Sequence, residues 1–207
     1  IMDNEVLVGS ANYTDGTKGV ARGGKTGEQI ISQLQGRFYE LAYRGELYQA
    51  YAIVTAPVIY TTAAGTGGPL IWNNSNTHNV VLLAATFGSS VVTTVAGTLG
   101  ITGNTGQTAA PTTTTAIDSN RNLKIGGQTP RSTAYRIGTT SSAGNFFVPL
   151  TAFHTGALTV DNNVGPGWID LGGGIICPPD CWVSLAGSAT LSTLVAQLGL
   201  IYTEVPV

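Results

Sequence analysis

The chain has 207 residues, of which 43% are hydrophobic and only 10% are charged, against about a quarter charged in an ordinary soluble domain. Gly, Thr, Ser and Asn interrupt every apolar run well short of about twenty residues, and this pattern argues against a membrane-spanning helix. Nine Lys and Arg against eleven Asp and Glu leave no basic stripe for phosphate contacts, so we expect no direct nucleic-acid binding.

The charged residues divide the chain into two parts. Eleven of the twenty lie between Asp3 and Glu46, and none lies from Leu47 through Ile117. We therefore predict an N-terminal arm and helix over residues 1–45 and one β domain over residues 46–207.

The predicted first part is an extended arm followed by one short α-helix. Gly9 to Gly27 is rich in Gly, Asn, Asp and Thr and has no sustained periodicity, which is typical of an extended segment. Over residues 28–44 the apolar residues recur at steps of four, four and three, so the spacing predicts a helix that ends at Gly45. One helix face then carries a stripe made of Ile30, Leu34, Phe38 and Leu41. This stripe either packs on the chain's own β domain or contacts a partner subunit, and the two readings are equally supported.

From Leu47 onward, short β-branched or aromatic runs alternate with turn residues, which is the pattern of an all-β sandwich. A parallel α/β sheet is disfavoured because it needs helical crossovers between strands. We predict Gly172–Gly174 to be a turn and Thr102–Thr115 to be a long loop. The predicted strands are Tyr48–Tyr60, Leu70–Trp72, Asn79–Phe87, Ser90–Leu99, Lys124–Ile125, Tyr135–Ile137, Asn145–Phe153, Leu158–Val160, Trp168–Leu171, Cys181–Leu185 and Leu194–Val205, of which about eight to ten should form.

One motif matches a nucleotide-binding pattern. Gly19 to Thr26 fits the phosphate-loop spacing of Gly, four residues, then Gly-Lys-Thr. A true phosphate loop follows a buried strand, whereas the residues before Gly19 are polar and rich in turn formers. We therefore interpret this segment as an arm leading into a capped helix, and expect no nucleotide or other cofactor.

Other catalytic chemistry is not indicated. His78 and His154 are the ready general bases, each near a predicted strand boundary and without an acid nearby in sequence. The three tryptophans, Trp72, Trp168 and Trp182, could stack on sugars but are more typical of a sandwich core or an interface. We expect a protein that is not an enzyme.

Two cysteines flank a turn in Cys177-Pro-Pro-Asp-Cys181. A structural zinc site needs four ligands, and two cysteines at this spacing do not supply them, so we expect no metal. A local disulfide and two free thiols are both compatible with the sequence.

The segment from Gly24 to Tyr51, followed by a Thr-, Gly- and Ala-rich β domain, resembles small virion structural proteins of tailed bacteriophages. Gly174 to Leu185 and the final Leu198 to Pro206 resemble the last hairpin and terminal strand of a viral jelly roll. The resemblance implies a jelly-roll-like β-sandwich that acts as a capsid decoration, or cement, protein. Such a protein is often a homotrimer, lies on the capsid surface of the virion, and clamps subunits of the major capsid protein.

The composition favours the same class. A neutral, Thr-rich sheet surface is desolvated at little cost, because few charges must be stripped of water or paired. Two alternatives stay open: a single-jelly-roll major capsid protein, and a fibre or spike module that binds receptor glycans through its tryptophans.

Overall fold

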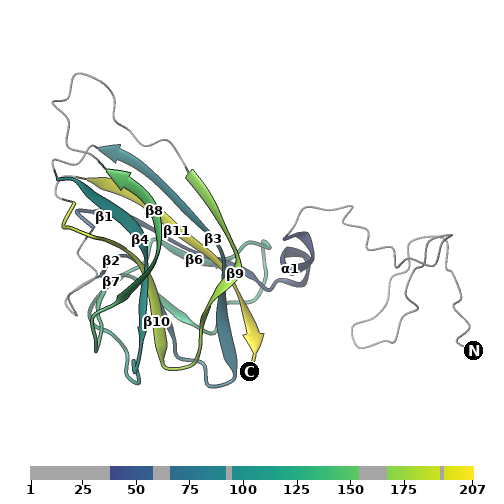
Figure 1. Cartoon of the computed structure of the whole chain (residues 1–207). Helices are drawn as coiled ribbons and strands as arrows, with labels where there is room; N and C mark the ends of the chain where they lie inside the picture. Colours follow the sequence, from purple (N-terminus) through teal and green to yellow (C-terminus); the bar gives the residue numbers. More distant parts are fainter. Residues whose placement is uncertain (1–37, 58–65, 92–94, 154–166, 192–193) are drawn as a thin grey trace, which may run out of the picture. The chain divides into compact units, whose positions relative to one another are not determined.

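The computed structural model describes residues 38–57, 66–91, 95–153, 167–191 and 194–207, and its compact β unit runs from Glu40 to Val207 (Figure 1). A six-residue helix, α1 (Tyr39–Arg44), precedes the first strand. The strands are β1 (Leu47–Thr55), β2 (Thr66–Asn73), β3 (His78–Val91), β4 (Gly97–Thr105), β5 (Thr112–Ala116), β6 (Ser119–Asn122), β7 (Thr133–Thr139), β8 (Asn145–Phe153), β9 (Gly167–Cys177), β10 (Cys181–Gly187) and β11 (Val195–Pro206).

The strands form two antiparallel sheets, with the orders β6-β1-β11-β3-β9 and β5-β7-β2-β10-β4-β8. The first four strands pair with the last four in reverse order: β1 with β11, β2 with β10, β3 with β9, and β4 with β8. A long hairpin whose successive pairs fall alternately into two packed sheets is a jelly roll. The predicted all-β, jelly-roll-like sandwich with one short helix is therefore confirmed.

An insertion between β4 and β8 widens both sheets at the same side of the sandwich. It contains β5, β6 and β7, of which β6 pairs with β1 and β7 pairs with β2. At this side the two sheets also contact each other, through β1 with β2 and β1 with β7. The other side of the sandwich ends in β8 and β9, each of which has one neighbour in its sheet.

The core lies between the two sheets and follows the two-residue period of the strands. Along β1 and β11 alternate side chains point inward and are buried: Tyr48, Ala50, Ala52 and Val54, and Ala196, Leu198, Leu200 and Tyr202. Strand β10 is buried on both faces, because the segments around Gln107 and Gly144 cover its outer side. Trp72 of the neighbouring strand donates its indole Nε1–H to the Gln107 carbonyl at 2.7 Å.

Several predicted boundaries are wrong. The expected strand Ser90–Leu99 falls on the end of β3 and the start of β4, and Val95 and Ala96, which the structure describes between them, lie outside both strands. Lys124–Ile125 lies in a bend and turn. The expected loop Thr102–Thr115 contains the end of β4 and most of β5, because Thr-rich segments readily form strands even when Gly interrupts them. The expected turn Gly172–Gly174 lies inside β9.

Other predictions are confirmed or lie outside the described residues. Asn145–Phe153 is β8 as predicted, and Gly45 closes α1 with a left-handed φ of 76°. The structure describes only the last part of the helix predicted over 28–44, and Leu158–Val160 lies outside the described residues.

Candidate functional site

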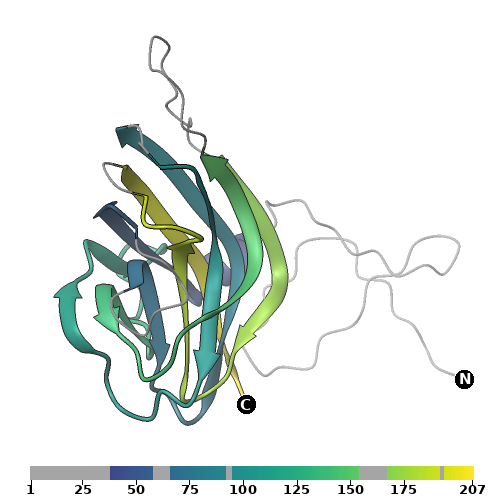
Figure 2. The same cartoon turned by 60° about the vertical axis from the view of Figure 1, so that its left-hand side comes forward.

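The open side of the sandwich holds the largest described hollow. Strands β8 and β9 lie along the same margin of the two sheets, which Figure 2 shows in dark and light green. Between them a groove of about 570 Å³ is lined by residues of β4, β8, β9 and β10. Among the described strands, β8 and β9 are the last in their sheets, so the groove lies where both sheets end.

A β-bulge directs one aromatic side chain into this groove. Ile101 of β4 pairs with Val148, and the next residue, Thr102, pairs with Phe146, so that Phe147 is left without a partner. Bulges of this kind re-aim a side chain and bend the strand. The Phe147 ring lies over Gly103, where an added Cβ would be 3.2 Å from the ring. Phe147 is consequently 53% exposed on the groove wall.

The opposite wall comes from β9 and is also apolar. Ile176 is 57% exposed there, and Ile175, Cys177 and Pro178 continue the lining. The polar members of the lining, Asn104, Thr105 and Asn145, are uncharged. Sequence reasoning did not single out Phe147 and Ile176. The available signal was a strand over 145–153 that has two adjacent aromatic residues and no charge.

The two cysteines lie on the wall of this groove as buried, free thiols. Of the two readings left open by the sequence, the structure has the free thiols. Burial raises the pKa of both thiols, and for Cys177 the nearby Cys181 adds to the effect. A thiol with a raised pKa stays protonated at neutral pH, which is the unreactive form. The Asn73 side-chain amide donates to the Cys177 carbonyl at 2.8 Å and holds the turn between the cysteines in place.

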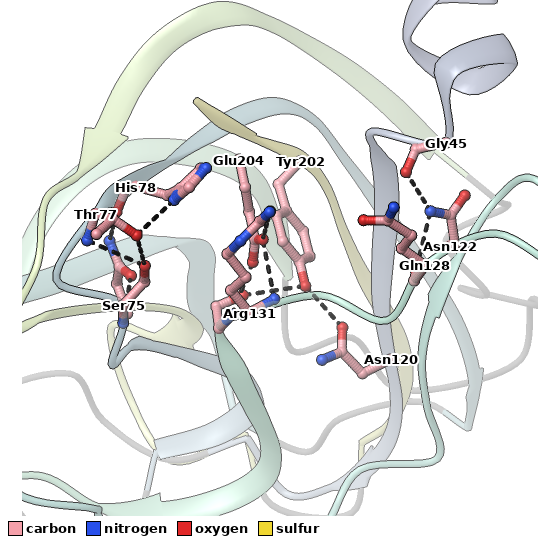
Figure 3. A network of polar contacts seen from close by, with 12 residues as sticks. Gly45, Ser75, Thr77, His78, Asn120, Asn122, Gln128, Arg131, Tyr202 and Glu204 are labelled. Atoms are coloured by element: carbon pink, nitrogen blue, oxygen red, sulfur yellow. Dashed lines mark hydrogen bonds and ion pairs between the residues drawn. The ribbon is translucent and has the colours of Figure 1, made fainter. Parts of the chain in front are cut away.

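A polar network on the other side of the sandwich is structural (Figure 3). Glu204 of β11 has a side chain that is only 1% exposed, and it accepts the backbone N–H of Arg131 at 2.9 Å and of Ser132 at 2.8 Å. The guanidinium of Arg131 lies 3.7 Å from the same carboxylate. The Tyr202 hydroxyl donates to the side-chain amide oxygen of Asn120 at 2.9 Å, and burial raises the pKa of this hydroxyl. These contacts attach the insertion to β11.

The candidate catalytic residues do not converge in the described part of the chain. His78 lies at the start of β3, with its Nδ1 2.8 Å from the Thr77 hydroxyl (Figure 3). His154 and the Gly19–Thr26 motif lie outside the described residues. Among the residues that are described, no cluster of three or more His, Cys, Asp or Glu is placed to hold a metal ion.

The three tryptophans have different surroundings. Trp182 is buried and pairs across the sheet with Trp72, whose indole is bonded to Gln107. Trp168, near the start of β9, is 53% exposed on the outer face of the five-stranded sheet. Only Trp168 therefore presents a large exposed surface.

The predicted helix stripe is described only in part. Leu41 lies in α1 and Phe38 directly before it, and both are half-buried. Ile30 and Leu34 lie outside the described residues. Whether the whole stripe packs internally or against a partner stays a prediction.

Among the residues described, no helix has the length and apolarity needed to cross a membrane. Comparisons with protein-family models, with curated proteins and with solved structures gave no match. The function is therefore argued from the residues and the fold.

Proposed function

We propose that this chain is a non-enzymatic virion structural protein, a capsid decoration subunit that associates with its own copies and stabilises the capsid lattice. The observation that supports the proposal is the open margin formed by β8 and β9. There two long strand edges and an apolar groove meet without a charged residue in the groove lining.

Such a margin favours covering by another protein. An edge strand presents unpaired N–H and C=O groups, and proteins that stay monomeric blunt their edges with charges, prolines or short strands. Here β8 and β9 have nine and eleven residues, and together they carry one proline, Pro149, and one charged residue, Asp170. Covering Phe147 and Ile176 would remove apolar surface from water, which stabilises association by about 25 cal/mol per Å².

The sequence supports the choice of partner. The resemblance to phage virion proteins implies a homotrimer that binds the major capsid protein on the capsid surface. Because only 10% of the residues are charged, removing water from the surfaces of both contacts costs little free energy. A jelly roll alone does not specify this role, since the fold serves several functions.

The first test is the oligomeric state. Sedimentation of the full chain at micromolar concentration should give a trimer, and Phe147→Asp combined with Ile176→Lys should give a monomer. Ile125→Lys is the matched control, because Ile125 is fully exposed but lies outside the groove. A wild-type chain that sediments as a monomer would contradict self-association.

The second test is particle binding. Purified chain should bind capsids that lack it, and capsids stripped of it should keep their shell. If removing the chain instead prevents shell formation, it is a single-jelly-roll major capsid protein and the decoration role is wrong.

A further inference from the structure

We propose that the outer face of the five-stranded sheet carries a binding site for a neutral carbohydrate. A shallow hollow of about 280 Å³ lies on this face, with Tyr51 and Trp168 at its ends and Thr86 and Gln197 between them. Its volume is near the lower end of the range of about 300–1,000 Å³ that is usual for small-molecule sites.

The strand register places the two aromatic residues in one row. Tyr51 of β1 is opposite Gly199 of β11, Gly199 is opposite Thr86 of β3, and Thr86 is opposite Trp168 of β9. Neighbouring strands lie about 4.8 Å apart, so the Cα atoms of Tyr51 and Trp168 are separated by about 14 Å. The row thus has an aromatic residue at each end, with Gly199 and Thr86 between them.

Gly199 lies beneath polar atoms of its neighbours. A Cβ added at Gly199 would lie 2.4 Å from the Thr86 hydroxyl and 3.3 Å from the Gln49 side-chain amide nitrogen, so these groups already fill the space over it. The polar side-chain groups that line the hollow are the Thr86 hydroxyl and the Gln197 amide. Both groups donate and accept hydrogen bonds.

These groups match the chemistry of a sugar. A pyranose presents C–H groups on its faces, which pack on aromatic rings, and hydroxyls at its rim, which pair with amides and hydroxyls. No residue that lines the hollow carries a formal charge, so the site offers no cation to an acidic sugar or a phosphate. A neutral glycan is the ligand class that fits.

The inference does not depend on the capsid proposal. The hollow lies on the outer face of one sheet, whereas the β8–β9 groove opens between the two sheets, and their linings share no residue. A single shallow site binds a sugar weakly, but several copies held in one assembly would bind a glycan-coated surface far more tightly through multivalency.

The experiment begins with a glycan array and continues with NMR titration of the labelled full chain. Neutral glycans should bind, and their disaccharides should perturb the Trp168 indole signal. Trp168→Ala and Tyr51→Ala should each weaken binding at least about tenfold. Ile125→Ala is the control, because Ile125 is fully exposed and lies outside both the hollow and the β8–β9 groove.

The outcomes are distinct. Binding that both aromatic variants lose and Ile125→Ala keeps, with unchanged thermal unfolding, supports the site. No binding to any neutral glycan, a preference for sialylated glycans, or undiminished binding by Trp168→Ala would each overturn it. The NMR titration with soluble disaccharides measures each site singly, whatever the oligomeric state, so failure there leaves the capsid proposal standing.

Discussion

At the scale of single residues, Glu204 shows how a buried charge is used to hold the fold. Its carboxylate receives two backbone N–H groups and a guanidinium, so each oxygen has a partner. Glu204→Gln replaces one oxygen with an NH₂ group that faces an N–H donor. We expect the free energy of unfolding to fall by about 2–3 kcal/mol, measured by urea titration.

Arg131→Ala is the contrasting change at the same site. The Arg131 side chain is 48% exposed, and its backbone N–H remains after the substitution. The guanidinium is half exposed and lies 3.7 Å from the carboxylate, whereas the backbone N–H groups donate to it at 2.8 and 2.9 Å, so this variant should lose less stability than Glu204→Gln. Equal losses would mean that the ion pair, and not the backbone contacts, holds the carboxylate.

The buried tyrosines and cysteines predict that the free energy of unfolding falls at alkaline pH. The pKa values of Tyr48, Tyr202, Cys177 and Cys181 are all raised, in each case mainly by burial. In the unfolded chain the thiols lose their protons near pH 8.5 and the tyrosines near about pH 10, whereas the folded chain still holds them. The unfolded state then binds fewer protons, so stability is full below about pH 8.5 and falls as the pH rises.

Urea unfolding at a series of pH values measures this loss. Tyr202→Phe removes one of the groups and should make the alkaline decline smaller, although the loss of its hydrogen bond lowers stability at neutral pH. A free energy of unfolding that stays constant up to pH values well above about 10 would show that the folded chain ionises as easily as the unfolded one.

At the scale of elements, β9 contains glycines whose backbone conformation other residues adopt only at a cost in free energy. Gly172 and Gly173 have φ values of 59° and 79°, a left-handed backbone that costs other residues about 1–2 kcal/mol. In Gly173→Ala the new Cβ would also lie 3.3 Å from a methyl group of Val81. Gly126 has a φ of 78° with open space around it, so Gly126→Ala carries the backbone cost alone.

We expect both alanine variants to lower the urea midpoint, and Gly173→Ala to lower it further. The difference between the two measures the contact with Val81. If Gly173→Ala were as stable as the wild type, β9 would not have the backbone described.

Several strands show which parts of the fold can be predicted from the sequence and which cannot. Runs with β-branched and aromatic residues, such as Asn145–Phe153, identify their strands correctly because local propensity and burial agree. The predicted loop Thr102–Thr115 contains strand residues because β10, β8 and β7 pair with them. Gly172–Gly174 lie inside β9 at a register shift against β3, where the left-handed φ of Gly172 and Gly173 agrees with the turn that their sequence predicts. The groove residue Phe147 depends on a bulge relative to β4, and a contact so distant in sequence leaves no local pattern.

At the scale of the whole molecule, the basic residues of the β domain lie at one side of the sandwich. All four Lys and Arg of the β domain lie between Arg121 and Arg136, in or next to the insertion that adds β5, β6 and β7. The opposite side, with β8 and β9, has an uncharged groove. The two sides therefore predict different salt responses if one of them forms the subunit interface.

Association through the β8–β9 side should be almost independent of sodium chloride, because salt screens charges and no charge lines the groove. We expect the sedimentation profile to change little between about 0.05 and 0.5 M sodium chloride, and sulfate to strengthen association because it favours apolar burial. Association through the insertion would instead weaken as salt rises. The variant Ile176→Lys also distinguishes the groove from the insertion as the interface. If the groove is the interface, a lysine there should dissociate the oligomer at every salt concentration. If the insertion is the interface, this variant should associate like the wild type.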